Sequence, residues 1–361
     1  MNALLILLGA FSLTLLMSNS GFFKKAHSFS YISIPLILGL AFSPEGLVPI
    51  LPSTRENLSW ALRVALTWIA FLSGAEMNRF SFGWSQTKKL VPFYAAYLLF
   101  FGVSFLLVGA VYYSDNSFEV LGVSMMASAA LFSSRENPFL LAILFVSLFF
   151  MLDKGIHTFE YKDLLYPLAI GVLLGVVFRL IFPPKEGLDT PIRLTLLGLC
   201  VLGTGWVIGI GSLEVLMGLS LGWVTAFNYG YGVCRDPSLN ASEGPILLVV
   251  PFFAGLYLHL NSEVILIGSA LAVFRLLIKF MLLKTGMRDA SRSEVLEQII
   301  PISHLALPIT LCLHLSGYSN ENTLFILNCF CVGFVVNDLF ALTIESFSRR
   351  SLKREEEVAY E

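Results

Sequence analysis

A long apolar run in the middle of the chain ends in two adjacent charges. Residues 139–157 read FLLAILFVSLFFMLDKGIH, with Asp153 directly before Lys154. Charges within an apolar run of this length are costly to place in a bilayer, and they often mark ion or proton sites. Burial favours the protonated form of a carboxyl group and a nearby cation favours the ionised form, so a carboxylate held in balance can exchange a proton for a cation. Asp153 is therefore the leading candidate for an ion- or proton-binding group. The alternative is a residue at the outer end of its segment, with its charge at the interface.

Basic residues in other apolar segments could supply a counter-charge. Arg275 and Lys279 are four residues apart, one helical turn, in the segment FRLLIKFMLLK. Arginine stays protonated, so Arg275 needs a buried partner. Asp153 is the first choice for it, with Glu76, Glu214 and Asp338 as further candidates. Lys279 could instead reach the membrane surface alone. Lys154 points about 100° away from Asp153 around a helix. The alternative to a counter-charge role is that its side chain extends to the outer lipid headgroups.

Three further polar residues are possible members of a proton relay. Glu76 lies at the end of an apolar segment, where an interfacial carboxylate is ordinary. Asp338 follows Asn337 in the last apolar segment, and the two resemble an ion-site pair. His304 lies between Pro301 and Pro308 in PISHLALPIT. A lone membrane histidine is more often a packing residue that forms hydrogen bonds.

The composition is that of a chain mostly in lipid. Hydrophobic residues make up 56% and charged residues 13% of the 361 residues, about half the charged share of a soluble domain. The five cysteines form no CxxC pair. No nucleophile elbow, HExxH or Walker loop is present, so the sequence predicts neither an enzyme nor a cofactor, and no nucleic-acid partner.

Apolar windows of span length predict an all-α polytopic membrane protein with about thirteen transmembrane helices. The windows are 2–19, 30–43, 57–77, 90–113, 118–134, 139–157, 164–182, 191–209, 212–228, 244–260, 263–283, 296–316 and 322–346. No soluble domain fits between them. We therefore predict one membrane domain, residues 1–350, and a short charged tail, residues 351–361.

The distribution of basic residues predicts the orientation. One set of alternate loops, with the tail, holds seventeen Lys and Arg, and the other set holds only Arg55 and Lys162. Because cytoplasmic loops carry the excess of Lys and Arg, we expect the N-terminus outside and the C-terminus in the cytoplasm, in a bacterial inner membrane.

Several spans carry residues that break helices. The second reads ISIPLILGLAFSPEG, and the fifth, SMMASAALFSS, is rich in small and hydroxyl residues, including Ser128, Ser133 and Ser134. Breaks at matching positions in two halves are typical of inverted-repeat transporters. The fifth and twelfth spans are seven apart, which predicts two inverted six-helix repeats, spans 1–6 and 8–13, with broken crossing helices.

The order of these features resembles the membrane domain of Kef-type cation:proton antiporters over nearly the whole chain. The segments that carry the resemblance are LILGLAFSPEGL (36–47), TWIAFLSGAEMN (67–78), VLMGLSLGWVTA (215–226), PFFAGLYLHLN (251–261) and FRLLIKFMLLK (274–284). The resemblance implies a sodium/proton antiporter-like fold, a homodimer, and exchange of H⁺ for a monovalent cation, Na⁺ or K⁺, by alternating access at an essential aspartate. Serines of the fifth span would then be further ion ligands.

The sixth span departs from that family's pattern. The family has Gln-Asp, Asn-Asp or Asp-Asp where this chain has Leu152-Asp153, and an alternative register places Ser147 at the essential position. Two other functions therefore stay open. One is a transport-inactive sensor or membrane partner of another protein, and the other is a transporter of a small organic anion bound by Arg275.

Overall fold

The computed structural model describes a set of helices and the connections next to them. The described residues are 9, 12, 33–44, 46–47, 49, 52–77, 84–111, 120–121, 124–125, 128, 161–181, 214–226, 248–286, 311, 324–340 and 342–343. Its labelled helices are α3 (Ser33–Ala41), α4 (Pro52–Met77), α5 (Trp84–Val111), α8 (Tyr161–Ile181), α10 (Glu214–Ala226) and α12 (Ser262–Gly286). Residues 248–256 and Leu324–Phe340 are also helical. Within these ranges there is no β-strand.

The helices fall where the apolar windows predict them. The window 263–283 lies inside α12, and the window 164–182 coincides with α8 to within three residues at each end. Ser262–Met281 is long and apolar enough to cross a membrane by itself. Shorter apolar helices occupy Ala61–Ala75, Ala95–Ala110, Leu165–Leu180, Val215–Thr225 and Leu324–Phe340. The windows 139–157 and 191–209, and almost all of 2–19, 118–134 and 296–316, lie outside the described residues.

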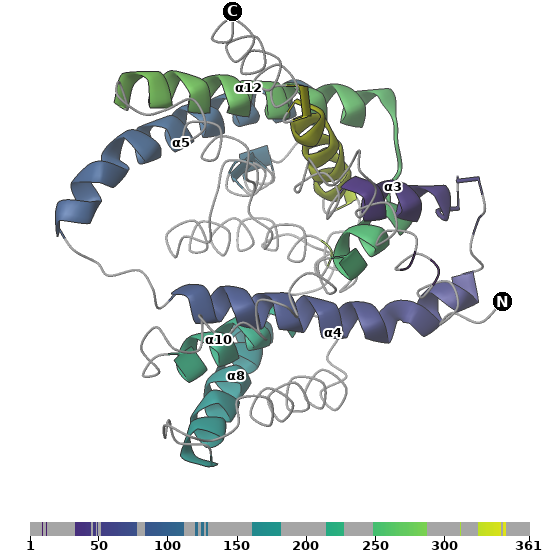
Figure 1. Ribbon diagram of the computed structural model, residues 1–361, viewed down its shortest axis with the longest axis vertical. Helices are drawn as coiled ribbons and strands as arrows, with labels where there is room; N and C mark the ends of the chain where they lie inside the picture. The colour runs from purple at the N-terminus through teal and green to yellow at the C-terminus, as the bar shows by residue number, and fades with distance from the viewer. Residues whose placement is uncertain are drawn as a thin grey trace, which may run out of the picture.

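Helices α4, α8 and α10 form one packing group, which we call the α4 group (Figure 1). Helix α10 lies between the other two and packs on both. Glycines on α10 allow its close approach to α4. A Cβ atom at Gly218 would lie 2.3 Å from the carbonyl oxygen of Thr67, and one at Gly222 would lie 2.0 Å from that of Phe71. Small residues at these positions let the two backbones touch, as in membrane helix pairs.

Helices α5, α12 and Leu324–Phe340 form the second packing group, the α12 group. Helix α12 packs on α5. On another face, a Cβ atom at Gly268 would lie 2.8 Å from the carbonyl oxygen of Cys329, so α12 also lies close against Leu324–Phe340. Among the labelled helices, any contact between the α4 group and α5 or α12 is marginal. Figure 1 shows α4, α8 and α10 together at one end and α5 and α12 together at the other.

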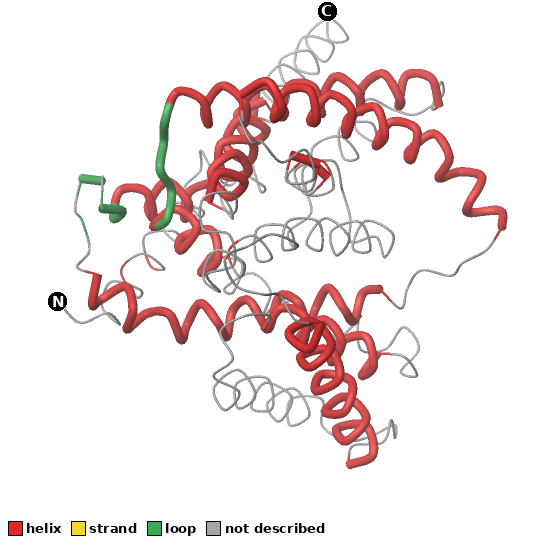
Figure 2. The backbone as a smooth tube through the Cα atoms, turned by 180° about the vertical axis from the view of Figure 1, so that it is seen from behind, coloured by secondary structure: helices red, strands yellow, loops and turns green. Residues whose placement is uncertain are grey.

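Helix α3 and residues 248–256 form a third unit, joined by glycines. A Cβ atom at Gly39 would lie 2.0 Å from the carbonyl oxygen of Phe252, and one at Gly255 would lie 2.2 Å from that of Leu36. The rings of Phe42 and Phe252 stack edge-on, with their centroids 6.2 Å apart. Residues 257–261 lead from this unit into α12, as Figure 2 shows from behind.

Helix α3 ends where its sequence predicts a break. The last helical residue is Ala41, and turns follow in which Ser43 N donates to Leu40 O and Gly46 N donates to Ser43 O, at 3.1 and 2.9 Å. Pro44 cannot continue the helix, because it has no N–H group and it disfavours a helical conformation at the residue before it.

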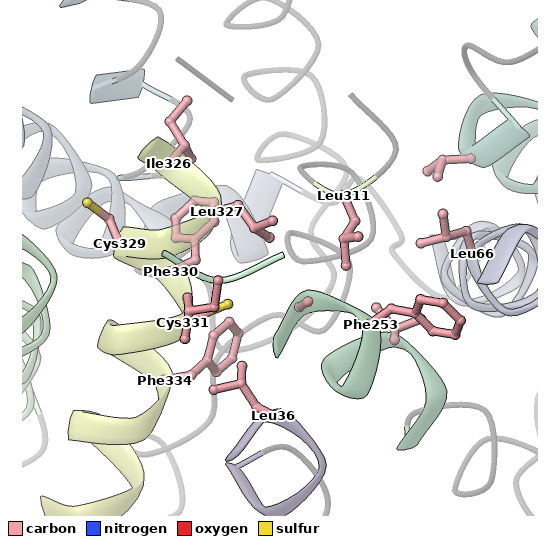
Figure 3. Packing of buried hydrophobic residues seen from close by; sticks show 14 of the residues in the cluster. Leu36, Leu66, Phe253, Leu311, Ile326, Leu327, Cys329, Phe330, Cys331 and Phe334 are labelled. Carbon is pink, nitrogen blue, oxygen red and sulfur yellow. The ribbon is translucent and has the colours of Figure 1, made fainter. Parts of the chain in front are cut away.

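The buried core runs from the third unit into both packing groups. Figure 3 shows Leu36 of α3 beside Phe334 of Leu324–Phe340, and Phe253 pointing toward Leu66 of α4. Large apolar side chains also cover the outside. On α8, Leu173 is 63% and Leu180 is 76% exposed, and on α12 Leu266 is 62% exposed. An apolar exterior over an apolar core is what a helix bundle in lipid requires.

Candidate functional site

Charged side chains are buried between α12 and Leu324–Phe340. Arg275 is fully buried, and Lys279 and Asp338 are 5% and 3% exposed. The Arg275 side chain donates a hydrogen bond from Nη1 to Oδ1 of Asn337. Its charge also interacts with the neighbouring Asp338 carboxylate and with Lys279, which lies one turn further along α12. Burial of charge is costly unless it is paired and hydrogen-bonded, so the interactions around Arg275 compensate for its position.

Asp338 connects this cluster to α3. The hydroxyl group of Ser33 donates a hydrogen bond to Oδ2 of Asp338, with 2.5 Å between the oxygens. The Asn337 side chain also hydrogen-bonds this carboxylate. One carboxylate therefore interacts with a hydroxyl from α3, an amide from its own helix and the charge of Arg275 on α12.

The cluster combines the groups that ion exchange needs. Carboxylate, hydroxyl and amide oxygens are the ligands that hard cations prefer. The guanidinium group of Arg275, which carries a positive charge, interacts with the Asp338 carboxylate.

Lys279 lies inside the cluster. Its 5% exposure places the side chain within the protein, which favours a role beside Arg275 over an extended position at the membrane surface. Of the partners weighed for Arg275 from the sequence, the structure brings Asp338 to it.

Ser128 occupies a separate buried position against α5. Its hydroxyl oxygen lies 2.9 Å from the backbone oxygen of Met125, to which it donates a hydrogen bond, and 3.2 Å from the hydroxyl of Tyr97. Sequence analysis selected Ser128 but not Tyr97. Tyrosines are common in apolar spans, so nothing in the sequence around Tyr97 distinguishes it from the others.

The other predicted site residues are not placed in this cluster. Asp153, Lys154, Ser133, Ser134, Ser147 and His304 lie outside the described residues. Glu76 belongs to the last turn of α4. Ser33 was missed by sequence analysis. The only signal was that Ser33 is a hydroxyl residue within an apolar span. Hydroxyl residues occur in most of the predicted spans, so this signal does not distinguish Ser33.

The fold is similar to that of a known antiporter. No protein-family model matches the chain, and no curated protein matches it by sequence. The structure resembles that of the sodium proton antiporter MjNhaP1 from Methanocaldococcus jannaschii at pH 8, with a TM-score of 0.52 and 16% sequence identity. The similarity covers 94% of this chain and 99% of the antiporter chain. The prediction of an all-helical, sodium/proton antiporter-like fold is therefore confirmed.

Proposed function

We propose that the protein is a secondary active transporter that exchanges a monovalent cation, Na⁺ or K⁺, for H⁺ across a membrane by alternating access. The observation that carries the proposal is the buried cluster of Asp338, Arg275 and Lys279 in a chain with an antiporter fold. Ionisable groups buried in such a chain are costly and usually functional.

In this mechanism Asp338 binds H⁺ or the cation in turn. Arg275 and Lys279 are the counter-charges that make the proton easy to displace. Asp153 is the proposed carboxylate of the corresponding span in the first repeat, with Lys154 beside it. Ser128, Ser133 and Ser134 of the fifth span are proposed as further ligands, with Ser147 as the alternative to Asp153. Glu76 and His304 are proposed as relay positions for the proton.

Helix directions support the proposed numbering of the spans. Successive positions on α10 contact successive positions on α4, Gly218 at Thr67 and Gly222 at Phe71, so the two helices run parallel. They are the ninth and third predicted spans, and odd-numbered spans should cross the membrane in the same direction. The contacts of Gly268 with Cys329 and of Arg275 with Asn337 also advance in the same order along α12 and Leu324–Phe340, the eleventh and thirteenth predicted spans, although these two helices cross (Figure 1).

The finer assignments are also proposals. The ordered motifs of the sequence support a Kef-type relationship, and this relationship suggests a homodimer. The excess of basic residues in alternate loops supports an N-terminus outside and a cytoplasmic C-terminus in a bacterial inner membrane. The domain boundaries proposed are a membrane domain of residues 1–350 and a tail of residues 351–361.

The test is exchange in proteoliposomes that hold the full chain. A dye that reports internal pH is followed after addition of NaCl, KCl or choline chloride. We expect a pH change with Na⁺ or K⁺ and none with choline. Asp338→Asn and Asp153→Asn should abolish it, while Glu263→Gln, which changes an exposed carboxylate at the start of α12, should retain it.

Three outcomes would contradict parts of the proposal. Wild-type exchange with neither cation would overturn the transport function. Full exchange by folded Asp338→Asn would remove Asp338 from the site. Currents evoked by small organic anions, with no response to Na⁺ or K⁺, would favour an anion transporter that uses Arg275 as a ligand.

A further inference from the structure

Two polar contacts join Leu324–Phe340, in the α12 group, to the unit formed by α3 and residues 248–256. Ser33 at the start of α3 donates to Asp338. His259 lies three residues after the helix 248–256. Its backbone N–H donates a hydrogen bond to Oδ1 of Asn328, at 3.2 Å. Asn328 and Asp338 are ten residues apart, about 15 Å along a helix. The same helix is thus held at two heights.

One contact comes from this closely packed unit, and the other comes from His259, three residues after the end of its helix 248–256. The mutual approach of Gly39 and Gly255 leaves no room for a Cβ atom on either side, and the Phe42 and Phe252 rings pack at the end of α3. Tightly packed helix pairs move as one body more readily than they deform. A shift of Leu324–Phe340 along this unit would therefore have to break or rearrange both hydrogen bonds.

The two contacts differ in how they respond to an ion. Asn328 is neutral whatever binds nearby, so its bond to His259 N–H is constant. Asp338 has a charge that changes with its occupancy. Among the described residues, Arg275 on α12 is the charged group that interacts with it, and Lys279 interacts in turn with Arg275. A hydrogen bond to an ionised acceptor is roughly twice as strong as one between neutral groups.

We propose that Ser33 is a positioning residue that couples the occupancy of Asp338 to the contact between α3 and Leu324–Phe340. The proposal rests on Asp338 being an exchange site. With the carboxylate empty, the charged hydrogen bond holds the two elements together. When H⁺ binds Oδ2, the Ser33 hydroxyl keeps its own proton but loses its charged acceptor. When a cation binds Oδ2, the carboxylate stays ionised but its oxygen is occupied by the cation, so in both cases the direct hydrogen bond weakens.

This arrangement would keep the unloaded transporter from moving. Alternating access in inverted-repeat transporters proceeds by movement of one helix bundle against the other. A contact that is strong only when the site is empty opposes that movement until H⁺ or a cation is bound. Ser33 would thereby reduce uncoupled leak.

Hydrogen exchange of the full chain in lipid nanodiscs, read from peptides that cover α3, tests the coupling without requiring transport. We expect Ser33→Ala and Asp338→Asn each to lower α3 protection several-fold in choline chloride. The double variant should be no lower than either single variant, because both changes remove the same bond. Ser33→Thr keeps the hydroxyl and should restore most of the protection.

Asn328→Ala is the matched control, since it removes the other contact of the same helix. Adding NaCl or KCl should lower α3 protection in the wild type and in Asn328→Ala, but leave Ser33→Ala unchanged. In proteoliposomes, Ser33→Ala should pass several-fold more H⁺ than the wild type when no cation is available for exchange. Asn328→Ala should show no comparable leak.

The outcomes separate this proposal from the proposed function. If Asp338→Asn keeps wild-type protection of α3, or if the effects of the two single variants add, Ser33 does not respond to the carboxylate and the coupling is overturned. If Ser33→Ala shows the wild-type response to salt and no leak, Ser33 is a structural contact only. Absence of exchange in the wild type would overturn the transport function, while non-additive protection would still support the coupling of Ser33 to Asp338.

Discussion

At the scale of single residues, the ionisable groups could be recognised from sequence, but the choice among their candidate partners could not be made. Arg275 and Asp338 stood out because each interrupts an apolar segment. The structure identifies Asn337, 62 residues further along the chain, as a hydrogen-bond acceptor for Arg275. Asp153, the first partner considered from the sequence, lies outside the described residues. Apolar patterning shows which residues are costly to bury. It does not show which helix faces meet, and that decides the pairing.

Replacing Arg275 should destabilise the protein through the charge it leaves behind. In Arg275→Met, Asp338 remains buried without the nearby guanidinium charge, and Asn337 loses its charged hydrogen-bond donor. Hydrogen bonds to charged groups contribute about 1.5–3 kcal/mol. We expect a marked fall in the midpoint of thermal unfolding, measured in detergent by intrinsic fluorescence.

The matched variant is Arg275→Met combined with Asp338→Asn. It leaves no buried carboxylate at this position, so it should recover a large part of the lost stability. Equal midpoints for the single and double variants would show that Arg275 stabilises the fold through other contacts.

At the scale of elements, the positions of the helices were predictable and some of their ends were not. The third apolar window begins at residue 57, whereas α4 begins at Pro52. Hydropathy detects the part of a helix that is apolar, and the first turn of α4 reads PSTRE. Proline is favoured at the first helical position, because its missing N–H group is not needed there. The structure thus extends this helix into a polar segment.

The glycines of α10 should be necessary for its contact with α4. A methyl group at Gly222 would overlap the carbonyl oxygen of Phe71 at 2.0 Å, so Gly222→Ala must push the two helices apart. Overpacking of this kind typically costs about 1–3 kcal/mol. We expect a lower midpoint of thermal unfolding and a lower yield of folded protein.

Gly102 provides the control for this substitution. It lies in α5, and a Cβ atom there would meet nothing within 4 Å. Alanine is favoured over glycine in helices by up to about 1 kcal/mol, so Gly102→Ala should leave stability unchanged or raise it. If Gly222→Ala behaves like Gly102→Ala, the close approach of α10 and α4 does not contribute to stability.

At the scale of the whole molecule, the division into packing groups was not predictable from apolar windows. All the windows are apolar, and the small residues that let helices approach occur in most of them. The structure resolves this by placing Gly218 and Gly222 of α10 against α4, and Gly39 and Gly255 against each other's helices. The expected two-repeat architecture came from helix breaks. Of the residues that predicted them, Ser133 and Ser134 in the fifth span and Pro301, His304 and Pro308 in the twelfth lie outside the described residues.

The membrane orientation of the whole chain can be tested by single cysteines on a background without the five native ones. Leu47, after α3, is 89% exposed, and Glu263, at the start of α12, is also exposed. An odd number of predicted spans separates each of these residues from Ser351 in the tail. Both should therefore lie on the opposite side of the membrane from Ser351. In intact cells, a maleimide that cannot cross membranes should label Leu47→Cys and Glu263→Cys but not Ser351→Cys. Permeabilised cells should show labelling at all three positions.

Labelling of Ser351→Cys alone in intact cells would reverse the orientation. Labelling of only one of the other two positions would contradict the assignment of spans between residues 47 and 263. That result would also remove the agreement between the parallel packing of α4 with α10 and the odd-numbered spans to which they are assigned.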